Sequence, residues 1–119
     1  MNNKKDNVRN NIKLIIRKLS DIDFQINVWL NGEYWDSITD FGEAINSLDD
    51  VCFFDSIKDN SIRFDNIENQ KKLSNFAKIL LEYEEPKEVS DMLKSEKWLD
   101  IVEQAKDIYT IISDLIVDI

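Results

Sequence analysis

Three stretches of the chain carry apolar residues at the spacing of an amphipathic helix. Two of them cover residues 73–85, where Pro86 stops the helix or begins the next one, and residues 98–119, which hold the longest and most regular stripe. The third covers residues 7–19, where the apolar positions follow i, i+4, i+7, i+8 and i+11: Val8, Ile12, Ile15, Ile16 and Leu19. The pattern predicts a mainly helical protein whose C-terminal helix is the core helix.

Two shorter segments complete the helical prediction. The first covers residues 40–48, because apolar side chains recur there at i, i+3, i+4 and i+7, with Thr39 as the N-cap. The second covers residues 89–93. Together with the three longer stretches, these segments give about five helices.

Residues 22–38 carry a different pattern. Apolar and polar side chains alternate over residues 22–30, which is typical of a half-buried strand. The Asn-Gly pair at 31–32 is the strongest short hairpin signal, because both central positions of a type I′ turn need positive φ. A two-residue turn there places Trp29 opposite Tyr34, on the face away from the core. A three-residue loop would instead shift the register and swap the faces of the second strand.

Residues 51–54 and 61–64 are short strand candidates on either side of a polar loop. We therefore expect the α+β class: a small antiparallel sheet centred on the 22–38 hairpin and packed by about five helices, with a long C-terminal helix. A chain of 119 residues that is 43% hydrophobic can bury one core. We expect a single domain over residues 1–119, with residues 1–6 disordered.

The formal net charge of −9 and the isoelectric point near 4.4 restrict the possible partners. Nucleic acid is a poor partner, because neutralising phosphates needs a basic surface, whereas a basic protein is the natural complement. No stretch reaches the length of a membrane span, and the N-terminal apolar run is too short for a signal peptide. A single cysteine excludes an internal disulfide. We expect a soluble cytoplasmic protein, and the sequence leaves its oligomeric state open.

The residue types of common catalytic and metal sites are missing or unfavourably placed. The chain has no histidine, which removes the commonest general base and the commonest metal ligand. Cys52 has apolar neighbours, so we expect a buried thiol rather than a nucleophile. Neither glycine begins a phosphate-binding motif, and residues 55–60 lack the acids and the glycine of a calcium-binding loop. We expect no enzyme, no cofactor and no metal site.

Residues 21–68 hold twelve acidic side chains and two basic ones. The same segment has two aromatic residues, Trp29 and Tyr34, on the hairpin face that points away from the core. Aromatic rings can anchor a partner and surrounding carboxylates can steer it, which is the composition of a protein-binding surface. The same pattern also fits a sheet covered on both faces by helices, with Trp29 and Tyr34 buried and the acids merely solvated. The candidate partner-binding residues are Asp23, Trp29, Glu33, Tyr34, Asp36, Asp40, Glu43, Asp49, Asp50, Asp55 and Asp59.

The first predicted helix is basic as well as amphipathic. Arg9, Lys13 and Arg17 follow one another at four-residue spacing. Such a helix can contact a membrane surface or nucleic acid, or it can pack on the core while its cations offset the acidic remainder. The second interpretation is favoured, because the helix is short and has no aromatic anchor. The sequence leaves open whether this helix has a partner of its own.

In size, acidity and lack of catalytic apparatus, the chain resembles the immunity proteins that neutralise bacterial toxins in contact-dependent growth inhibition and other polymorphic toxin systems. Its richness in Asn, Ile, Lys and Asp is also typical of an AT-rich bacterial genome. The resemblance implies a protein that binds a cationic toxin domain, often a nuclease, and plugs its active site or covers a nearby surface. Residues 21–68 would then face the toxin.

Two other classes of function compete with this one. A DNA-mimic inhibitor or an acidic regulatory adaptor would also be anionic, but a mimic is expected to space its acids like phosphates, whereas these acids cluster irregularly. An enzyme that uses carboxylates, Lys or Tyr would need a concave pocket that gathers several of them.

Overall fold

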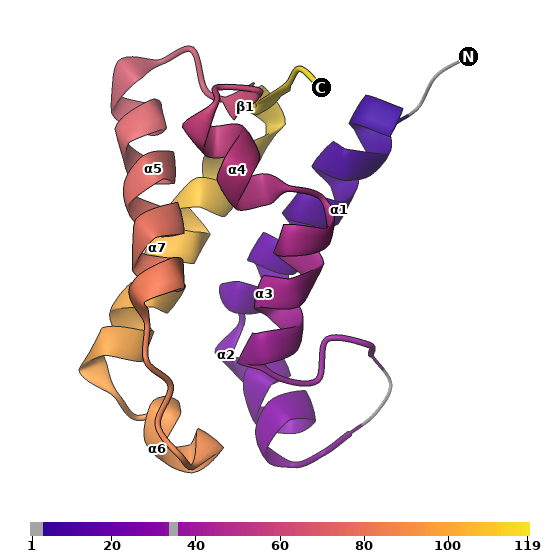
Figure 1. Ribbon diagram of the computed structural model, residues 1–119. Helices are drawn as coiled ribbons and strands as arrows, with labels where there is room; N and C mark the ends of the chain where they lie inside the picture. Colours follow the sequence, from indigo (N-terminus) through magenta and orange to yellow (C-terminus); the bar gives the residue numbers. More distant parts are fainter. Residues whose placement is uncertain (1–3, 34–35) are drawn as a thin grey trace.

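The computed structural model describes residues 4–33 and 36–119 (Figure 1). The helical elements of these residues are α1 (Lys4–Leu19), α2 (Ile22–Phe24), the π-helix η1 (Gln25–Leu30), α3 (Phe41–Asp50), α4 (Phe53–Lys58), α5 (Ile67–Glu82), α6 (Val89–Met92), α7 (Glu96–Ile111) and the 3-10 helix η2 (Ile112–Asp114). Two strands, β1 (Ile62–Arg63) and β2 (Ile116–Val117), pair antiparallel with Ile62 opposite Val117. The predicted α+β class with a long C-terminal helix is confirmed.

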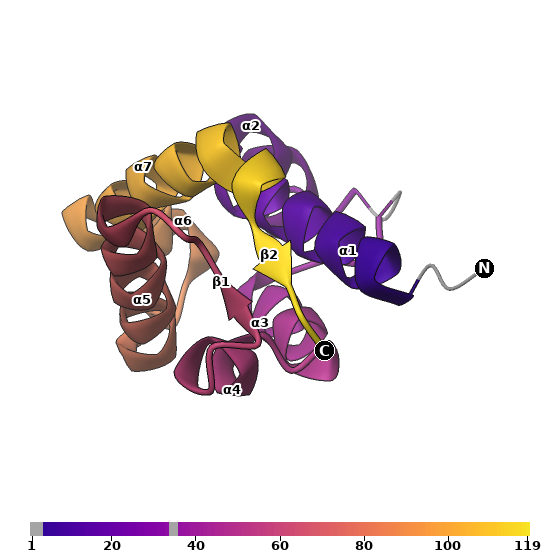
Figure 2. The same cartoon turned by 90° about the horizontal axis from the view of Figure 1, so that it is seen from above.

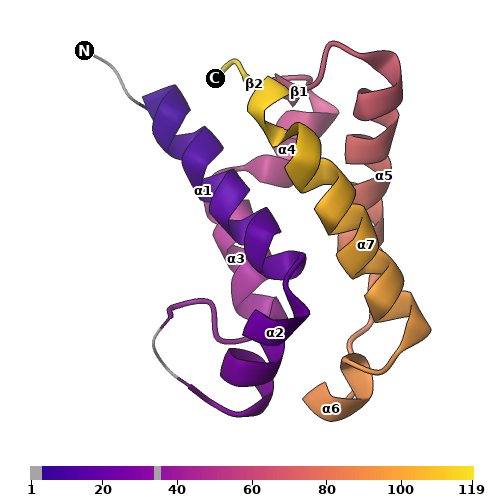
Figure 3. The same ribbon diagram turned by 180° about the vertical axis from the view of Figure 1, so that it is seen from behind.

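The longer helices surround a single hydrophobic core (Figure 2). Helix α7 packs against both α1 and α5, and α1 also packs against α3. The strand pair lies at the end of the molecule where α1 begins and the chain ends, while α2 and α6 lie at the opposite end (Figures 1 and 3). Because β1 connects α4 to α5, the two-stranded sheet joins the C-terminal residues to the middle of the chain.

The predicted 22–38 hairpin, and with it the position of the sheet, is wrong. Asp21 caps α2 by accepting a hydrogen bond from the Phe24 N–H, and the chain continues as a helix through η1 to Leu30. The alternation that indicated a strand also contains helical spacing. Phe24 and Val28 are four residues apart, and both are buried on the same side of this helical segment.

The Asn-Gly pair ends this helical segment instead of turning a hairpin. Asn31 is the C-cap of η1, and Gly32 follows it with φ of 73°, the left-handed conformation that commonly terminates a helix. Trp29 is therefore buried, with 6% of its surface exposed, and is not part of an exposed aromatic pair. Tyr34 and Trp35, which were expected in the second strand, lie outside the described residues.

Four local predictions around α3 and β1 have different outcomes. Residues 51–54 do not form a strand, because Cys52 adopts a left-handed conformation with φ of 57° and α4 begins immediately after it. The Cys52 side chain is exposed, contrary to the expected burial. The strand predicted within 61–64 is confirmed as β1. Helix α3 is confirmed, although its cap is Asp40 and not Thr39.

The remaining helices are confirmed with changes at the two ends of the chain. Lys4 begins α1, so residues 4–6 are helical where disorder was predicted; residues 1–3 lie outside the described part. The last helix ends at Ile111, and residues 112–119 turn away through η2 into β2 instead of continuing the helix. The five apolar positions predicted for the first helix are all buried.

A buried glutamine connects three segments of the core. The Gln25 side-chain Nε2 donates hydrogen bonds to the carbonyls of Lys18 and Leu19, at 2.9 and 3.1 Å, and the Trp98 indole N–H donates to Gln25 Oε1 at 2.9 Å. Gln25 and Trp98 are both 0% exposed. The last carbonyls of a helix have no partner within the helix. Gln25 therefore satisfies the end of α1 and ties it to α7; we call this set of hydrogen bonds the Gln25 bridge.

Aromatic rings pack around the Gln25 bridge. The Trp98 ring has its centroid 5.9 Å from that of Trp29 and 5.3 Å from those of Phe41 and Tyr83. The Trp29 indole N–H donates to the Ile38 carbonyl at 3.0 Å. These contacts hold η1, the start of α3 and the residues after α5 against α7.

Replacing Gln25 tests the bridge. We expect Gln25→Leu to lower the free energy of unfolding by about 2–4 kcal/mol, because it leaves the buried Trp98 N–H and the Leu19 carbonyl without partners, whereas the Lys18 carbonyl keeps the Asp21 N–H. The measurement is urea unfolding followed by tryptophan fluorescence. Gln104→Leu, on the surface of α7, is the matched control and is expected to change stability by less than about 0.5 kcal/mol. Equal effects of the two substitutions would contradict this role for Gln25.

Candidate functional site

Helix α3 presents an acidic stripe. Asp40, Glu43, Ser47 and Asp50 lie at i, i+3, i+7 and i+10, which places them along one side of the helix. Asp40 is the N-cap and accepts a hydrogen bond from the Glu43 N–H at 2.7 Å. Glu43 and Asp50 are exposed. We call these four residues the α3 stripe.

The C-terminal end of α3 concentrates negative charge. Asp49 and Asp50 are its last two residues, and no basic residue lies in its last turn. The carbonyl end of a helix already carries partial negative charge, so acidic side chains there are unfavourable by roughly 0.3–1 kcal/mol each. In the described part of the chain, no lysine or arginine forms a salt bridge with Asp49 or Asp50. The end of α3 is therefore an uncompensated anionic site.

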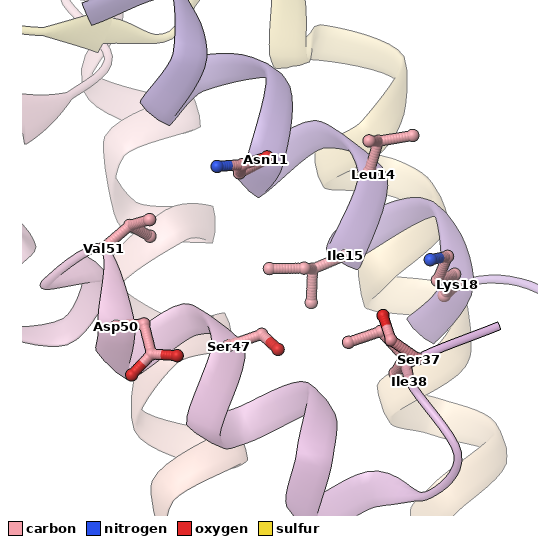
Figure 4. A pocket seen from close by; sticks show the side chains of 9 residues that line it. All are labelled: Asn11, Leu14, Ile15, Lys18, Ser37, Ile38, Ser47, Asp50 and Val51. Atoms are coloured by element: carbon pink, nitrogen blue, oxygen red, sulfur yellow. The ribbon is translucent and has the colours of Figure 1, made fainter. Parts of the chain in front are cut away.

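A groove runs between α1 and α3 beside the α3 stripe (Figure 4). Ile15 points from α1 into the space between the two helices, Asn11 lies one turn before it, and Ser47 and Asp50 lie on the α3 side. Val51 also lines the groove, whose volume is about 300 Å³. The groove thus combines apolar contact surface with an unpaired carboxylate.

The other end of the groove is closed by an internal ion pair. Lys18 Nζ lies 2.8 and 2.9 Å from the two carboxylate oxygens of Asp36, and Asp36 also accepts a hydrogen bond from the Ile38 N–H at 2.8 Å. Burial raises the pKa of Asp36, but the hydrogen bonds from Lys18 and Ile38 and the charge of Lys18 outweigh it and lower the pKa overall. Asp36 is therefore structural, because it holds the chain before α3 against α1.

The eleven residues predicted to bind a partner do not form one patch. Trp29 is buried, Asp36 is paired internally, and Tyr34 lies outside the described residues. Helices α2 and α4, which carry two of the acids, lie near opposite ends of α3 (Figures 1 and 3). The structure gathers Asp40, Glu43, Asp49 and Asp50 on α3, and places exposed acids elsewhere at Asp23, Glu33, Asp55 and Asp59.

Asp59 differs from the other exposed acids because it organises its own loop. It accepts hydrogen bonds from the side chain and the backbone N–H of Ser61, and these hydrogen bonds lower its pKa. This acid helps to place the start of β1.

The α1 side of the groove was not predicted from the sequence. Asn11, Ile15 and Lys18 belong to the first helix, for which the sequence predicted an apolar stripe that packs on the core and a basic surface, but no groove. Leu14 lies outside the apolar stripe of that helix and is 49% exposed at the groove, but a single exposed leucine is common on protein surfaces and gave no signal by itself.

A second hollow, of about 580 Å³, lies between α5 and α7. It is lined by Tyr83, Glu84, Lys97 and Asp100, among others, which are the residue types an enzyme without histidine would need. Glu84, Lys97 and Asp100 are exposed, so water screens their charges.

Two acids meet near the start of α3. Burial, and secondarily the negative charge of Asp40, raise the pKa of Glu85. Burial also raises the pKa of Tyr83, with a further contribution from Glu85, and the Tyr83 hydroxyl is buried without a hydrogen-bond partner in the described part of the chain. Asp40 therefore adds negative charge to the segment that follows α5 as well as capping α3.

Comparisons with known proteins identify no similar protein. No protein-family model, curated protein or solved structure matches the chain. Within residues 4–33 and 36–119, no group of three or more cysteine or acidic side chains is arranged to hold a metal ion. Among the same residues, no helix has both the length and the apolar character needed to cross a lipid bilayer.

The Asp36 ion pair predicts a pH-dependent difference in stability. We expect Asp36→Asn to lower the free energy of unfolding by about 1–3 kcal/mol at neutral pH, because the substitution removes the charge that Lys18 pairs with. A carboxyl whose pKa is lowered by folding stabilises the fold above its unfolded-state pKa and loses that contribution as the pH falls through its folded-state pKa. The difference between the two proteins should therefore shrink as the pH falls below about 4.

Urea unfolding at a series of pH values measures this difference. Asp23→Asn, at an exposed acid of α2, is the matched control and is expected to give a small difference at every pH. A deficit of Asp36→Asn that stays constant down to the acid limit would show that the ion pair is not its cause.

Proposed function

We propose that this chain is a cytoplasmic immunity protein that binds and neutralises a basic bacterial toxin domain through the α3 side of its surface. The observation that carries the proposal is the uncompensated charge at the end of α3, where Asp49 and Asp50 are exposed, unpaired within the described residues and unfavourably placed for the helix itself. Residues that reduce the stability of the free protein are typical of surfaces kept for a partner. The formal net charge of −9 also favours a positively charged partner.

The geometry changes the form of the interaction expected from the sequence. The surface has no exposed Trp29 anchor, because that ring packs in the core against Trp98. The apolar contact on this side comes from Leu14, at the edge of the groove, while the α3 stripe supplies the charge. Opposite charges on the partner would accelerate association and make it sensitive to salt.

Neutralising the end of α3 tests the proposal. We expect Asp49→Asn with Asp50→Asn to reduce the association rate with a basic toxin domain encoded beside this protein by about tenfold at low salt, because two steering charges are removed. Protection of a bacterial host that expresses the toxin should fall in parallel. The measurements are surface plasmon resonance over a range of salt concentrations and growth of the host.

A second double variant keeps the net charge matched. Asp107→Asn with Asp114→Asn removes two exposed acids near the end of α7 and is expected to retain protection. Equal loss in both double variants would assign the effect to net charge alone. Failure of the unmodified protein to bind or protect against any basic toxin domain encoded beside it would contradict the proposal.

A further inference from the structure

The α1–α3 groove has one charge that is not compensated within it. Lys18, at one end, is already neutralised by Asp36 at 2.8 Å. Asp50, at the other end, is exposed and belongs to no salt bridge of the described residues. The groove therefore offers a net negative charge at the end where α3 also presents the negative end of its dipole.

The floor of the groove is apolar. Ile15 and Ile38 are 5% and 6% exposed, respectively, and Val51 is half-buried beside them. A long basic side chain binds such a surface with its methylene groups while its charged head stays near a carboxylate. A volume of about 300 Å³ lies at the lower limit of small-molecule pockets, which are typically about 300–1,000 Å³, and suits a single side chain.

The polar groups that line the groove favour arginine over lysine. The Ser47 hydroxyl and the Asn11 side-chain amide lie on opposite sides of the groove, and each carries an oxygen that can accept a hydrogen bond (Figure 4). A guanidinium has five N–H donors in a planar fork and can bind a carboxylate with two of them while others reach neighbouring acceptors. An ammonium group is a compact point charge with three donors, so it reaches fewer of these separated acceptors at once.

We propose that the α1–α3 groove receives one arginine side chain of the basic partner. Its methylene groups lie on Ile15 and Val51, and its guanidinium pairs with Asp50 and reaches Ser47. This inference rests on the proposed function for the source of the arginine. The chemistry of the groove for arginine can be measured without the partner.

Two other depressions are less suited to this ligand. The depression between α1 and α7 is lined by Lys13 and Arg17, which repel a cation. The hollow between α5 and α7 also has acids at a helix end, because Glu82 is the last residue of α5, but Lys97 lines the hollow with them and belongs to no salt bridge of the described residues. Arginine binding at the α5–α7 hollow, or at the depression that Asp65 and Asp114 line without a basic residue, is therefore the competing outcome that the experiment must be able to detect.

The test uses N-acetyl-arginine-N-methylamide as the probe, titrated into the isotope-labelled protein and followed by amide chemical shifts. We expect saturable shifts at Ile15, Ser47 and Val51. The citrulline analogue has the same shape without the charge and is expected to leave these shifts unchanged. The lysine analogue is expected to bind more weakly than the arginine probe.

Two variants and a matched control make the site assignment specific. We expect Asp50→Asn to weaken arginine binding by about fivefold without lowering the melting temperature, because Asp50 opposes the helix dipole in the free protein. Ser47→Arg places a guanidinium of the chain itself three residues before Asp50 and is expected to abolish the shifts. Glu84→Gln, in the α5–α7 hollow, is the control and is expected to leave arginine binding unchanged.

Opposite results would overturn the inference. They are shifts centred on Ile79 and Ile101 in the α5–α7 hollow, equal shifts with citrulline, or equal weakening by Asp50→Asn and Glu84→Gln. The proposed function fails separately. If the groove binds arginine but the protein protects against no toxin, the groove chemistry stands and the immunity role does not. If the protein protects and Asp50→Asn and Ser47→Arg protect equally well, the toxin is bound elsewhere and the groove inference is wrong.

Discussion

The structure depends most on the hydrogen bonds of one buried side chain. Gln25 is fully buried, satisfies two carbonyls at the end of α1 and accepts the Trp98 N–H of α7. A buried amide is costly unless its polar atoms have partners, and here each of them does. The bridge fixes where α1 ends relative to α7 and holds η1 beside Trp98. In this position the Trp29 indole N–H donates a hydrogen bond to the Ile38 carbonyl, in the segment that leads to α3.

Those constraints place α3 beside α1 and thereby create the groove. Asp36 reaches Lys18 from the same connecting segment, so an ion pair closes one end and leaves Asp50 alone at the other. Among the described residues, no lysine or arginine forms a salt bridge with the acids at the end of α3. A basic partner would place a positive charge beside these acids, and the complex would gain a favourable electrostatic interaction that the free protein does not have. The packing of the core thus places the unfavourable acids of α3 where, in the proposed function, a basic partner binds.

The sequence predicted the helices well because their apolar stripes are long and regular. The prediction failed over residues 22–38 for two reasons. The same apolar positions fit both the alternation of a strand and the i, i+4 spacing of a helix. Gly32 follows the C-cap of η1 and terminates that helix instead of turning a hairpin. The sequence could not place β2, because Leu115, Ile116 and Ile119 continue the apolar stripe of the last helix, and β2 forms only by pairing with the distant strand β1. The acids of α3 were found, whereas the groove depends on packing between helices that are far apart in sequence.

The most direct test of the central claim is a double-mutant cycle across the complex with the basic partner. Each arginine on the partner's surface is changed to glutamine, alone and together with Asp50→Asn, and the dissociation constants are measured. We expect one arginine whose coupling with Asp50 is on the order of 1 kcal/mol or more. Additive effects for every arginine would show that Asp50 and the α1–α3 groove do not receive an arginine from the partner.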